Sequence, residues 1–239
     1  MCTYICRFVI LMRKISYTVP PALDGSSVAA VLRSHGFSTA LLRSLKKTYG
    51  ALSRNGCPVR TVDPVHTGDI VAVELNTDGA TAPPSAEKAV IVYADRDILV
   101  VNKRAGMAMY ETYNHHGNAL SNAVAAAGFD GPFRPIYRLD KDTSGLVVLA
   151  RHQLSAAKLA GKVQKDYYAV VPGAYTGSGT VDAPIAHCPD STVKRQVDPA
   201  GVRAVTHWEA LGQQGGRTLL RVQLETGRTH QIRVHFAHL

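Results

Sequence analysis

The octapeptide at residues 138–145, Arg-Leu-Asp-Lys-Asp-Thr-Ser-Gly, contains side chains that are well suited to chemistry. Its central carboxylate, Asp140, lies between an arginine and a Thr-Ser-Gly turn, and the apolar run 146–150 follows directly. A carboxylate at the mouth of a buried strand is a candidate catalytic group, although an isolated aspartate is more often a solvated surface residue. A second polar cluster, at residues 224–235, therefore has to be considered together with it.

Three segments, taken together, resemble the motifs of a known family. They are 138–145, the alternating segment 165–173 (Lys-x-Tyr-x-Ala-x-Val-x-Gly) and the segment 227–235 (Gly-Arg-Thr-His-Gln-Ile-Arg-x-His). In this order they resemble the RluA-type RNA pseudouridine synthases, over the part of the chain from about residue 87 to the C-terminus. The combination is highly specific, whereas any one of the segments alone would only be suggestive.

The resemblance implies an isomerisation that needs neither a cofactor nor a metal. Uracil is detached from its ribose and rejoined through a ring carbon, with no redox change. Asp140 would be the essential carboxylate, which attacks the anomeric carbon of the sugar or carbon 6 of uracil, or assists glycal formation. Arg228 would keep it ionised, since a nearby guanidinium lowers a carboxyl pKa by about 1 to 3 units. Tyr167 would stack on the uracil ring and act near the carbon that loses its proton.

The resemblance also implies residues that bind the substrate. A base in a stem must be extruded before it can react, and Arg138 would help to fill the space that it leaves. Ile232 would pack against the ring of Tyr167 as a wall of the pocket, while His230 and Gln231 would shape the site by hydrogen bonding. Further basic residues are candidates for phosphate contacts: Lys103, Arg104, Lys141, Arg151, Lys194, Arg195 and Arg233.

The elements that must position these residues are mostly strands. Residues 90–103 are typical of a strand, an Asp-centred turn and a second strand, and three further strands are expected at 167–171, 204–211 and 218–224. Short helices are expected at 118–127 and 154–163. Runs of strands with few crossover helices favour a mixed, mainly antiparallel sheet. We therefore expect an α+β catalytic domain with an RNA-binding cleft.

Residues 18–75 form a second, smaller α+β pattern. Ser26 or Ser27 could cap one short helix and Ser38 another, because apolar residues follow each at helical spacing. The Asn-Gly pair at 55–56 predicts a hairpin turn, and strands are expected after it at 59–62 and 68–75. This order resembles the alpha-L RNA-binding fold, which occurs in a small-subunit ribosomal protein and as an appendage on RNA-modifying enzymes. Candidate RNA contacts on its second helix are Arg43, Lys46 and Lys47, for which a plain solvated face is the alternative.

The pattern divides the chain into four parts. Residues 1–17 are an N-terminal extension and a first strand, and Met12 just before that strand suggests that residues 1–11 lie upstream of the fold. The RNA-binding domain spans 18–75, and a Thr-, Ala- and Pro-rich linker spans 76–86. The catalytic domain spans 87–239. The family usually continues beyond this end, so the resemblance implies a catalytic domain that is incomplete at its C-terminus.

Composition supports an RNA partner. The 239 residues include 27 Lys and Arg against 18 Asp and Glu, for a formal charge of +9, which suits a polyanion. Ribosomal RNA is favoured slightly over transfer RNA by the appended domain. The four cysteines form no CxxC pair, so neither a disulfide framework nor a cysteine zinc site is indicated, and a cytoplasmic location is expected. The N-terminal apolar run is too short to span a bilayer, and we expect a monomer without membrane contact.

Two other classes of function are weaker. In a metal hydrolase, His230, His235 and His238 could bind a metal with Asp140 or Asp142, but on a strand residues five apart point to opposite faces. No His-Glu-x-x-His pattern supports zinc either. The other class is a catalytically inactive RNA-binding or ribosome-associated protein. The intact set of Asp140, Tyr167 and Arg228 argues against it.

Overall fold

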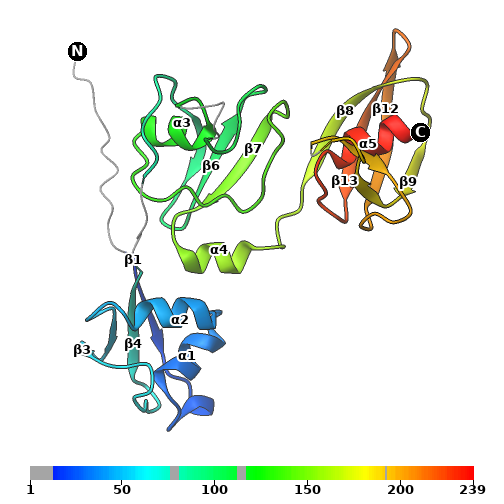
Figure 1. The fold of residues 1–239 in the computed structure, drawn as a ribbon. Coiled ribbons are helices and arrows are strands. Elements are labelled where there is room, and N and C mark those ends of the chain that lie inside the picture. The colour runs from blue at the N-terminus through cyan, green and yellow to red at the C-terminus, as the bar shows by residue number, and fades with distance from the viewer. Residues whose placement is uncertain (1–12, 76–80, 112–116, 192) are drawn as a thin grey trace. The chain divides into compact units, whose positions relative to one another are not determined.

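The computed structural model describes residues 13–75, 81–111, 117–191 and 193–239. The proposed upstream segment 1–11 and the first part of the linker lie outside the described residues. The chain divides into two compact units, Met1–Val163 and Gln164–Leu239, which are drawn in Figure 1. Every strand pair in both units is antiparallel, which confirms the predicted α+β fold with mainly antiparallel sheets. No helix in the described ranges is long and apolar enough to cross a membrane.

The first unit begins with a small sheet that two short helices cover (Figure 1). Its strand order is β1-β4-β2-β3. The hydroxyl of Ser27 accepts a hydrogen bond from Ala30 N at 3.3 Å, and that of Ser38 accepts one from Leu41 N at 3.2 Å, so the predicted caps start both helices. The elements are β1 (Arg13–Thr18), η1 (Pro21–Leu23), α1 (Val28–Ser34), α2 (Thr39–Leu45), β2 (Leu52–Arg54), β3 (Cys57–Pro58) and β4 (Ile70–Leu75).

The hairpin between β2 and β3 turns at Asn55-Gly56, as predicted. Both residues have positive φ, 50° and 85°, which is the conformation that this dipeptide favours in a two-residue turn. The strand predicted at 59–62 is wrong. β3 ends at Pro58, and Val59 N makes one further hydrogen bond, to Leu52 O at 3.1 Å. Beyond it, the carbonyls of Thr61 and Asp63 accept hydrogen bonds from the first amides of α1.

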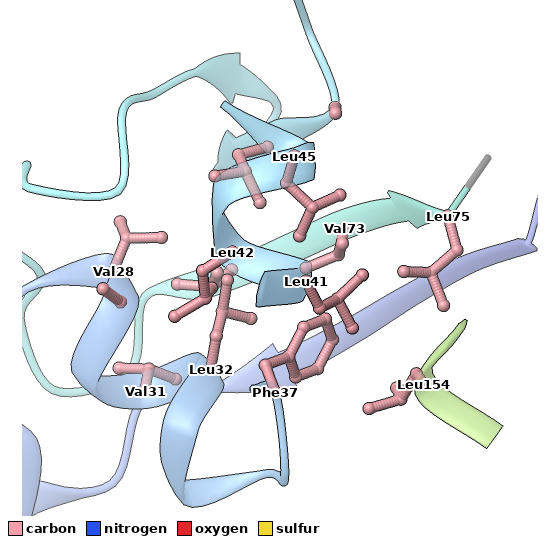
Figure 2. Close-up of a cluster of buried hydrophobic side chains, with 14 of the residues drawn as sticks. Val28, Val31, Leu32, Phe37, Leu41, Leu42, Leu45, Val73, Leu75 and Leu154 are labelled. Atoms are coloured by element: carbon pink, nitrogen blue, oxygen red, sulfur yellow. The ribbon is translucent and has the colours of Figure 1, made fainter. Parts of the chain in front are cut away.

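A single apolar cluster forms the core of this region (Figure 2). The buried faces of α1 and α2 meet β4, and Leu154 of helix α4 (Gln153–Leu159), whose side chain is 2% exposed, belongs to the same cluster. The residues labelled in Figure 2 are Val28, Val31, Leu32, Phe37, Leu41, Leu42, Leu45, Val73, Leu75 and Leu154. Leu154, which is distant in the sequence, therefore completes the core formed by residues up to Leu75.

Truncating this side chain tests that packing. Leu154→Ala should lower the free energy of unfolding of the first unit by about 2 to 5 kcal/mol, because a fully buried leucine leaves a cavity. Chemical denaturation measures the change. Leu146→Ala is the control, since Leu146 is 53% exposed and in the same unit, and it should cost less than about 0.5 kcal/mol. Equal costs for the two variants would show that Leu154 is not part of this core.

The rest of the first unit is a three-stranded sheet with the order β5-β6-β7. The predicted strand, turn and strand at 90–103 are confirmed, because Asp95 Oδ1 accepts from the amides of Asp97 and Ile98 at 2.7 Å and closes the turn. The helix predicted at 118–127 is also present, and that at 154–163 ends earlier, at Leu159. The elements are β5 (Val90–Ala94), β6 (Ile98–Lys103), α3 (Leu120–Ala126), β7 (Gly145–Ala150) and α4.

The second unit contains a four-stranded sheet with the order β8-β13-β12-β9, a two-stranded sheet β10-β11 and helix α5. The three predicted strands are confirmed. The expectation of a strand through His230 and His235 is wrong, because these residues begin and line helix α5. His230 has φ 58°, in the left-handed region, so the chain reverses before the helix starts. The elements are β8 (Asp166–Pro172), β9 (Ser178–Asp182), β10 (Ile185–His187), β11 (Arg195–Val197), β12 (Val205–Gln214), β13 (Arg217–Leu224) and α5 (Gln231–His238).

Candidate active site

Asp140 lies in the loop that leads into β7. The turn after it is closed by a hydrogen bond from Thr143 N to Asp140 O at 3.1 Å. Its neighbour Leu139 is buried and anchors the loop, whereas Asp140 itself is half-buried. Gly145, which follows the loop, has φ 133° and pairs with Lys103 of β6. The structure therefore holds this carboxylate at the start of a buried strand, partly open to solvent.

A buried lysine lies beside this loop. The side chain of Lys103 is 0% exposed, and its Nζ donates to three backbone carbonyls, those of Arg104 (3.0 Å), Met107 (2.9 Å) and Lys141 (2.9 Å). Burial lowers the pKa of Lys103, and the negative charges of Asp142 and Asp140 oppose that shift. The expectation that Lys103 contacts RNA phosphate is wrong, because its ammonium is enclosed by the protein. It instead fixes the carbonyl next to Asp140.

The chain before Arg138 is attached to the edge of β7. Ile136 N donates to Val148 O at 2.9 Å, and Ala150 N donates to Arg134 O at 2.8 Å. Arg138 is exposed, and its positive charge lies close enough to Tyr110 to oppose the rise that burial causes in the pKa of that phenol. Tyr110 packs edge-on against Phe133, with ring centroids 5.2 Å apart. No periodic pattern of residues predicts this aromatic pair, because two loops form it.

In the second unit, Tyr167 and Ile232 belong to one apolar cluster. Tyr167 lies on β8 opposite Val222 of β13. Both Tyr167 and Ile232 are partly buried and pack against the cluster of Val171, Leu220 and Val222. The sheet and helix α5 thus bring the predicted stacking ring and the predicted pocket wall to the same patch of the unit.

Arg228 lies in the loop between β13 and α5. The residue is exposed, but two hydrogen bonds hold it: Nε donates to Arg203 O at 3.0 Å, and its backbone N–H donates to Gln231 Oε1 at 2.9 Å. Gln231 is 2% exposed, and His230 is half-buried. The guanidinium is therefore presented at the surface by an ordered loop.

The predicted catalytic residues fall in different units. Asp140 and Arg138 belong to the first unit, and Tyr167, Arg228, His230, Gln231 and Ile232 belong to the second. The first motif, 138–145, lies in the first unit, and the other two, 165–173 and 227–235, lie in the second. The pairing of Asp140 with Arg228 stays a prediction.

The histidines of the third motif are not grouped as metal ligands. Within residues 13–75, 81–111, 117–191 and 193–239, no group of three or more His, Cys, Asp or Glu could hold a metal ion. His235 is 0% exposed, and its two ring nitrogens lie 2.8 Å from Thr206 Oγ1 and 3.0 Å from Ala183 O. Both nitrogens are thus engaged within the protein.

The basic residues predicted for the RNA-binding helix are exposed. Arg43 lies in α2, and Lys46 and Lys47 directly follow it; all three are exposed, whereas Leu41, Leu42 and Leu45 are buried. Tyr49, two residues after Lys47, is 96% exposed. This arrangement leaves three cations and an aromatic ring in solvent within one short segment.

The chain is similar to known proteins of one class and one family. The matching relatives and solved structures are RNA-modifying isomerases of one kind, pseudouridine synthases. The chain belongs to the RNA pseudouridylate synthase family, because the sequence model of that family matches residues 97–238. The match contains all three motif segments, and the predicted family and enzyme class are confirmed.

The curated relatives are similar over most of the chain. An uncharacterized RNA pseudouridine synthase of Bacillus subtilis, YjbO, is 36% identical over 85% of this chain and 76% of its own length. A ribosomal large subunit pseudouridine synthase D of Xylella fastidiosa is 36% identical over 93% of this chain and 70% of its own length. The protein of the same name from Pseudomonas aeruginosa is 37% identical over 80% and 62%.

Two solved human structures share the fold. The RNA pseudouridylate synthase domain containing 1 protein aligns with a TM-score of 0.51 and 25% identity, over 64% of this chain and 66% of that chain. The domain containing 4 protein aligns with a TM-score of 0.50 and 24% identity, over 62% and 64%. In both alignments this chain spans slightly less than two thirds of the solved chain.

Proposed function

We propose that this chain isomerises uridine to pseudouridine in structured ribosomal RNA, with Asp140 as the essential carboxylate. The observation that carries the proposal is the family match over residues 97–238, within which Asp140, Tyr167 and Arg228 are all present at the motif positions. Relatives over most of the chain are named ribosomal large subunit pseudouridine synthase D, which supports ribosomal RNA as the substrate class.

The proposed reaction leaves the composition of the nucleotide unchanged. The bond between the sugar's anomeric carbon and uracil N1 breaks, a bond from the same carbon to uracil carbon 5 forms, and the proton of carbon 5 leaves while N1 gains one. Asp140 attacks the sugar or carbon 6, or assists glycal formation. The partly open loop before β7 suits all three roles, because the carboxylate stays accessible to an extruded base.

Arg228 is proposed to pair with the carboxylate during the reaction. A guanidinium can bind a carboxylate through two parallel hydrogen bonds, which keeps it ionised and also orients it. The ordered loop that holds Arg228 by its backbone N–H supports this role. Tyr167 and Ile232, on one apolar patch, are proposed to hold the uracil ring, and Arg138 to fill the space that the base leaves.

Tritium release tests the activity. RNA that carries tritium at carbon 5 of uracil should lose the label on incubation with the chain, and a chelator should not reduce the rate. Loss of release with chelator would favour a metal enzyme. No release from ribosomal or transfer RNA pools would leave an inactive RNA-binding protein as the function. Pseudouridine mapping in total RNA with and without the gene then identifies the modified uridine.

The domain at residues 18–75 is proposed to be an alpha-L type RNA-binding domain. Three exposed basic residues support this: Arg43 on α2, and Lys46 and Lys47 directly after it. Lys46→Gln combined with Lys47→Gln should weaken RNA binding and lower the slope of log affinity against log salt by about 1.4 to 1.8, since each lost phosphate contact removes about 0.7 to 0.9. Filter binding across a salt series measures both values.

A matched pair of lysines controls for net charge. Lys88 and Lys162 are exposed residues of the same unit, and Lys88→Gln with Lys162→Gln removes the same two charges elsewhere. An equal fall in salt slope for the two double variants would mean that α2 makes no special contact. We further propose that the chain acts as a cytoplasmic monomer. Sedimentation of the purified chain tests the oligomeric state.

A further inference from the structure

A buried polar network joins helix α5 to the loop that carries Arg228. Gln231 Oε1 accepts from Arg228 N and from Thr226 Oγ1, both at 2.9 Å. Its Nε2 donates to Val205 O at 2.9 Å and to Thr206 Oγ1 at 3.0 Å. All four hydrogen-bonding positions of this amide are therefore used inside the protein. Gln231 presents no free donor or acceptor to a substrate, although the motif predicts a substrate-binding role.

The direction of each hydrogen bond follows from groups that can only donate or only accept. Ala183 O accepts, so Nε2 of His235 carries the proton. Burial lowers the pKa of His235, which keeps the ring neutral and leaves Nδ1 to accept the hydroxyl proton of Thr206 at 2.8 Å. Thr206 Oγ1 then accepts from Gln231.

The same logic fixes the amide of Gln231. The backbone N–H of Arg228 can only donate, so the oxygen of the amide, not its nitrogen, must face it. Val205 N donates in turn to Thr226 Oγ1 at 2.9 Å, which ties the start of the loop to β12. One orientation of every group satisfies the whole network, and the members Thr206, Gln231 and His235 are 0%, 2% and 0% exposed.

We propose that Thr206, Gln231 and His235 are positioning residues that set the place of Arg228, and that none of them touches the substrate. The proposal rests on the catalytic role proposed for Arg228. The amide oxygen of Gln231 holds the backbone of Arg228, Thr206 orients that amide, and His235 orients the hydroxyl of Thr206. A fixed loop matters because a misplacement of about 1 Å can cost about 100-fold in rate.

The fold offers a matched control for this network. Thr218, at the other end of the β12–β13 hairpin, is also 0% exposed, and its hydroxyl also makes two hydrogen bonds, to Gly173 O at 2.8 Å and from Tyr175 N at 3.1 Å. Thr206 pairs with Leu224, whereas Thr218 pairs with Gln213. Replacing either threonine by valine removes a buried hydroxyl from the same sheet. Only Thr206 is connected to Arg228, through hydrogen bonds of the Gln231 amide.

Kinetics of tritium release compare the two variants. Thr206→Val should lower kcat about 10-fold with KM for RNA changed less than about two-fold, while Thr218→Val should leave kcat within about two-fold of the wild type. Thr206→Ser keeps the hydroxyl and should restore kcat. Combined with Arg228→Met, Thr206→Val should cause no further loss. Equal kcat values for the two valine variants, or a full additional 10-fold loss in the double variant, would overturn the proposal.

Amide exchange reports on the loop without any activity. Nuclear magnetic resonance of the full chain should show faster hydrogen exchange at Arg228 N–H in Thr206→Val than in Thr218→Val, because the acceptor amide is no longer oriented. If Thr206→Val does not fold, Gln231→Met replaces it, with the same expected kinetics and exchange. If the wild type releases no tritium, the proposed function fails, and exchange alone decides whether the network holds the loop. Equal exchange at Arg228 in both variants would show that it does not.

Discussion

Replacing Asp140 by asparagine is expected to abolish pseudouridine formation while RNA affinity stays nearly unchanged. Asparagine has the same shape but neither the negative charge nor the nucleophilic oxygen that every version of the proposed mechanism needs. We expect tritium release to fall by at least about 10³-fold, a typical loss for a residue that acts directly on the reacting bond. RNA binding by a filter assay should change by less than about two-fold, because phosphate contacts supply most of the affinity.

The same substitution two positions away is the control. Asp142 is exposed and lies in the same loop, so Asp142→Asn makes an identical chemical change without reaching the proposed role. It should retain turnover. Retained turnover in Asp140→Asn would rule out Asp140 as the essential carboxylate, and an equal loss in both variants would point to a general effect of loop charge.

Elements that depend on neighbouring residues could be predicted from the sequence. The caps Ser27 and Ser38 and the turn at Asn55-Gly56 are local, because each makes its hydrogen bond or adopts its φ within three residues. The turn that Asp95 closes is local as well. These features set where helices and strands begin, and the structure confirms them.

Elements that depend on distant partners were predicted less well. Residues 59–62 have the composition of a strand, but the carbonyl of Arg60 accepts from Asp63 N and that of Thr61 accepts from Ala29 N of α1. The third motif was expected to be a strand, which would keep its histidines from sharing a metal. It forms α5 because Gln231 and His235, four apart, both find buried polar partners on β12 and beside β9. Those partners lie 25 and 52 residues away in the sequence, so no local sequence pattern predicts these contacts.

The motifs point to candidate site residues but not to the residues that hold them in place. Motif spacing predicted roles for Asp140, Tyr167 and Arg228, and the structure places them in a loop, on strand β8 and in a loop. The residues that hold them could not be found in this way. Lys103 resembles any surface lysine in the sequence, and it is buried only because β6 and β7 pair and bring Lys141, 38 residues away, to its ammonium. Supporting residues depend on tertiary structure more than catalytic ones do.

Replacing Lys103 by methionine should have the second large effect, on both stability and activity. Methionine fills a similar volume but leaves three carbonyls, those of Arg104, Met107 and Lys141, without the ammonium that now binds them. A buried acceptor without a partner costs about 1 to 3 kcal/mol. Some of these carbonyls will find water or relax, so we expect the free energy of unfolding of the first unit to fall by about 3 kcal/mol.

Activity should fall for a separate reason. The carbonyl of Lys141 belongs to the residue that follows Asp140, so loss of its bond to Lys103 should let the loop that carries Asp140 move. Tritium release by Lys103→Met, measured well below its unfolding temperature, should therefore fall about 10-fold or more. Lys88→Met, at an exposed site of the same unit, should change stability by less than about 0.5 kcal/mol and leave turnover intact. A Lys103→Met variant that loses stability but keeps full turnover when folded would show that Lys103 supports the fold and not the position of Asp140.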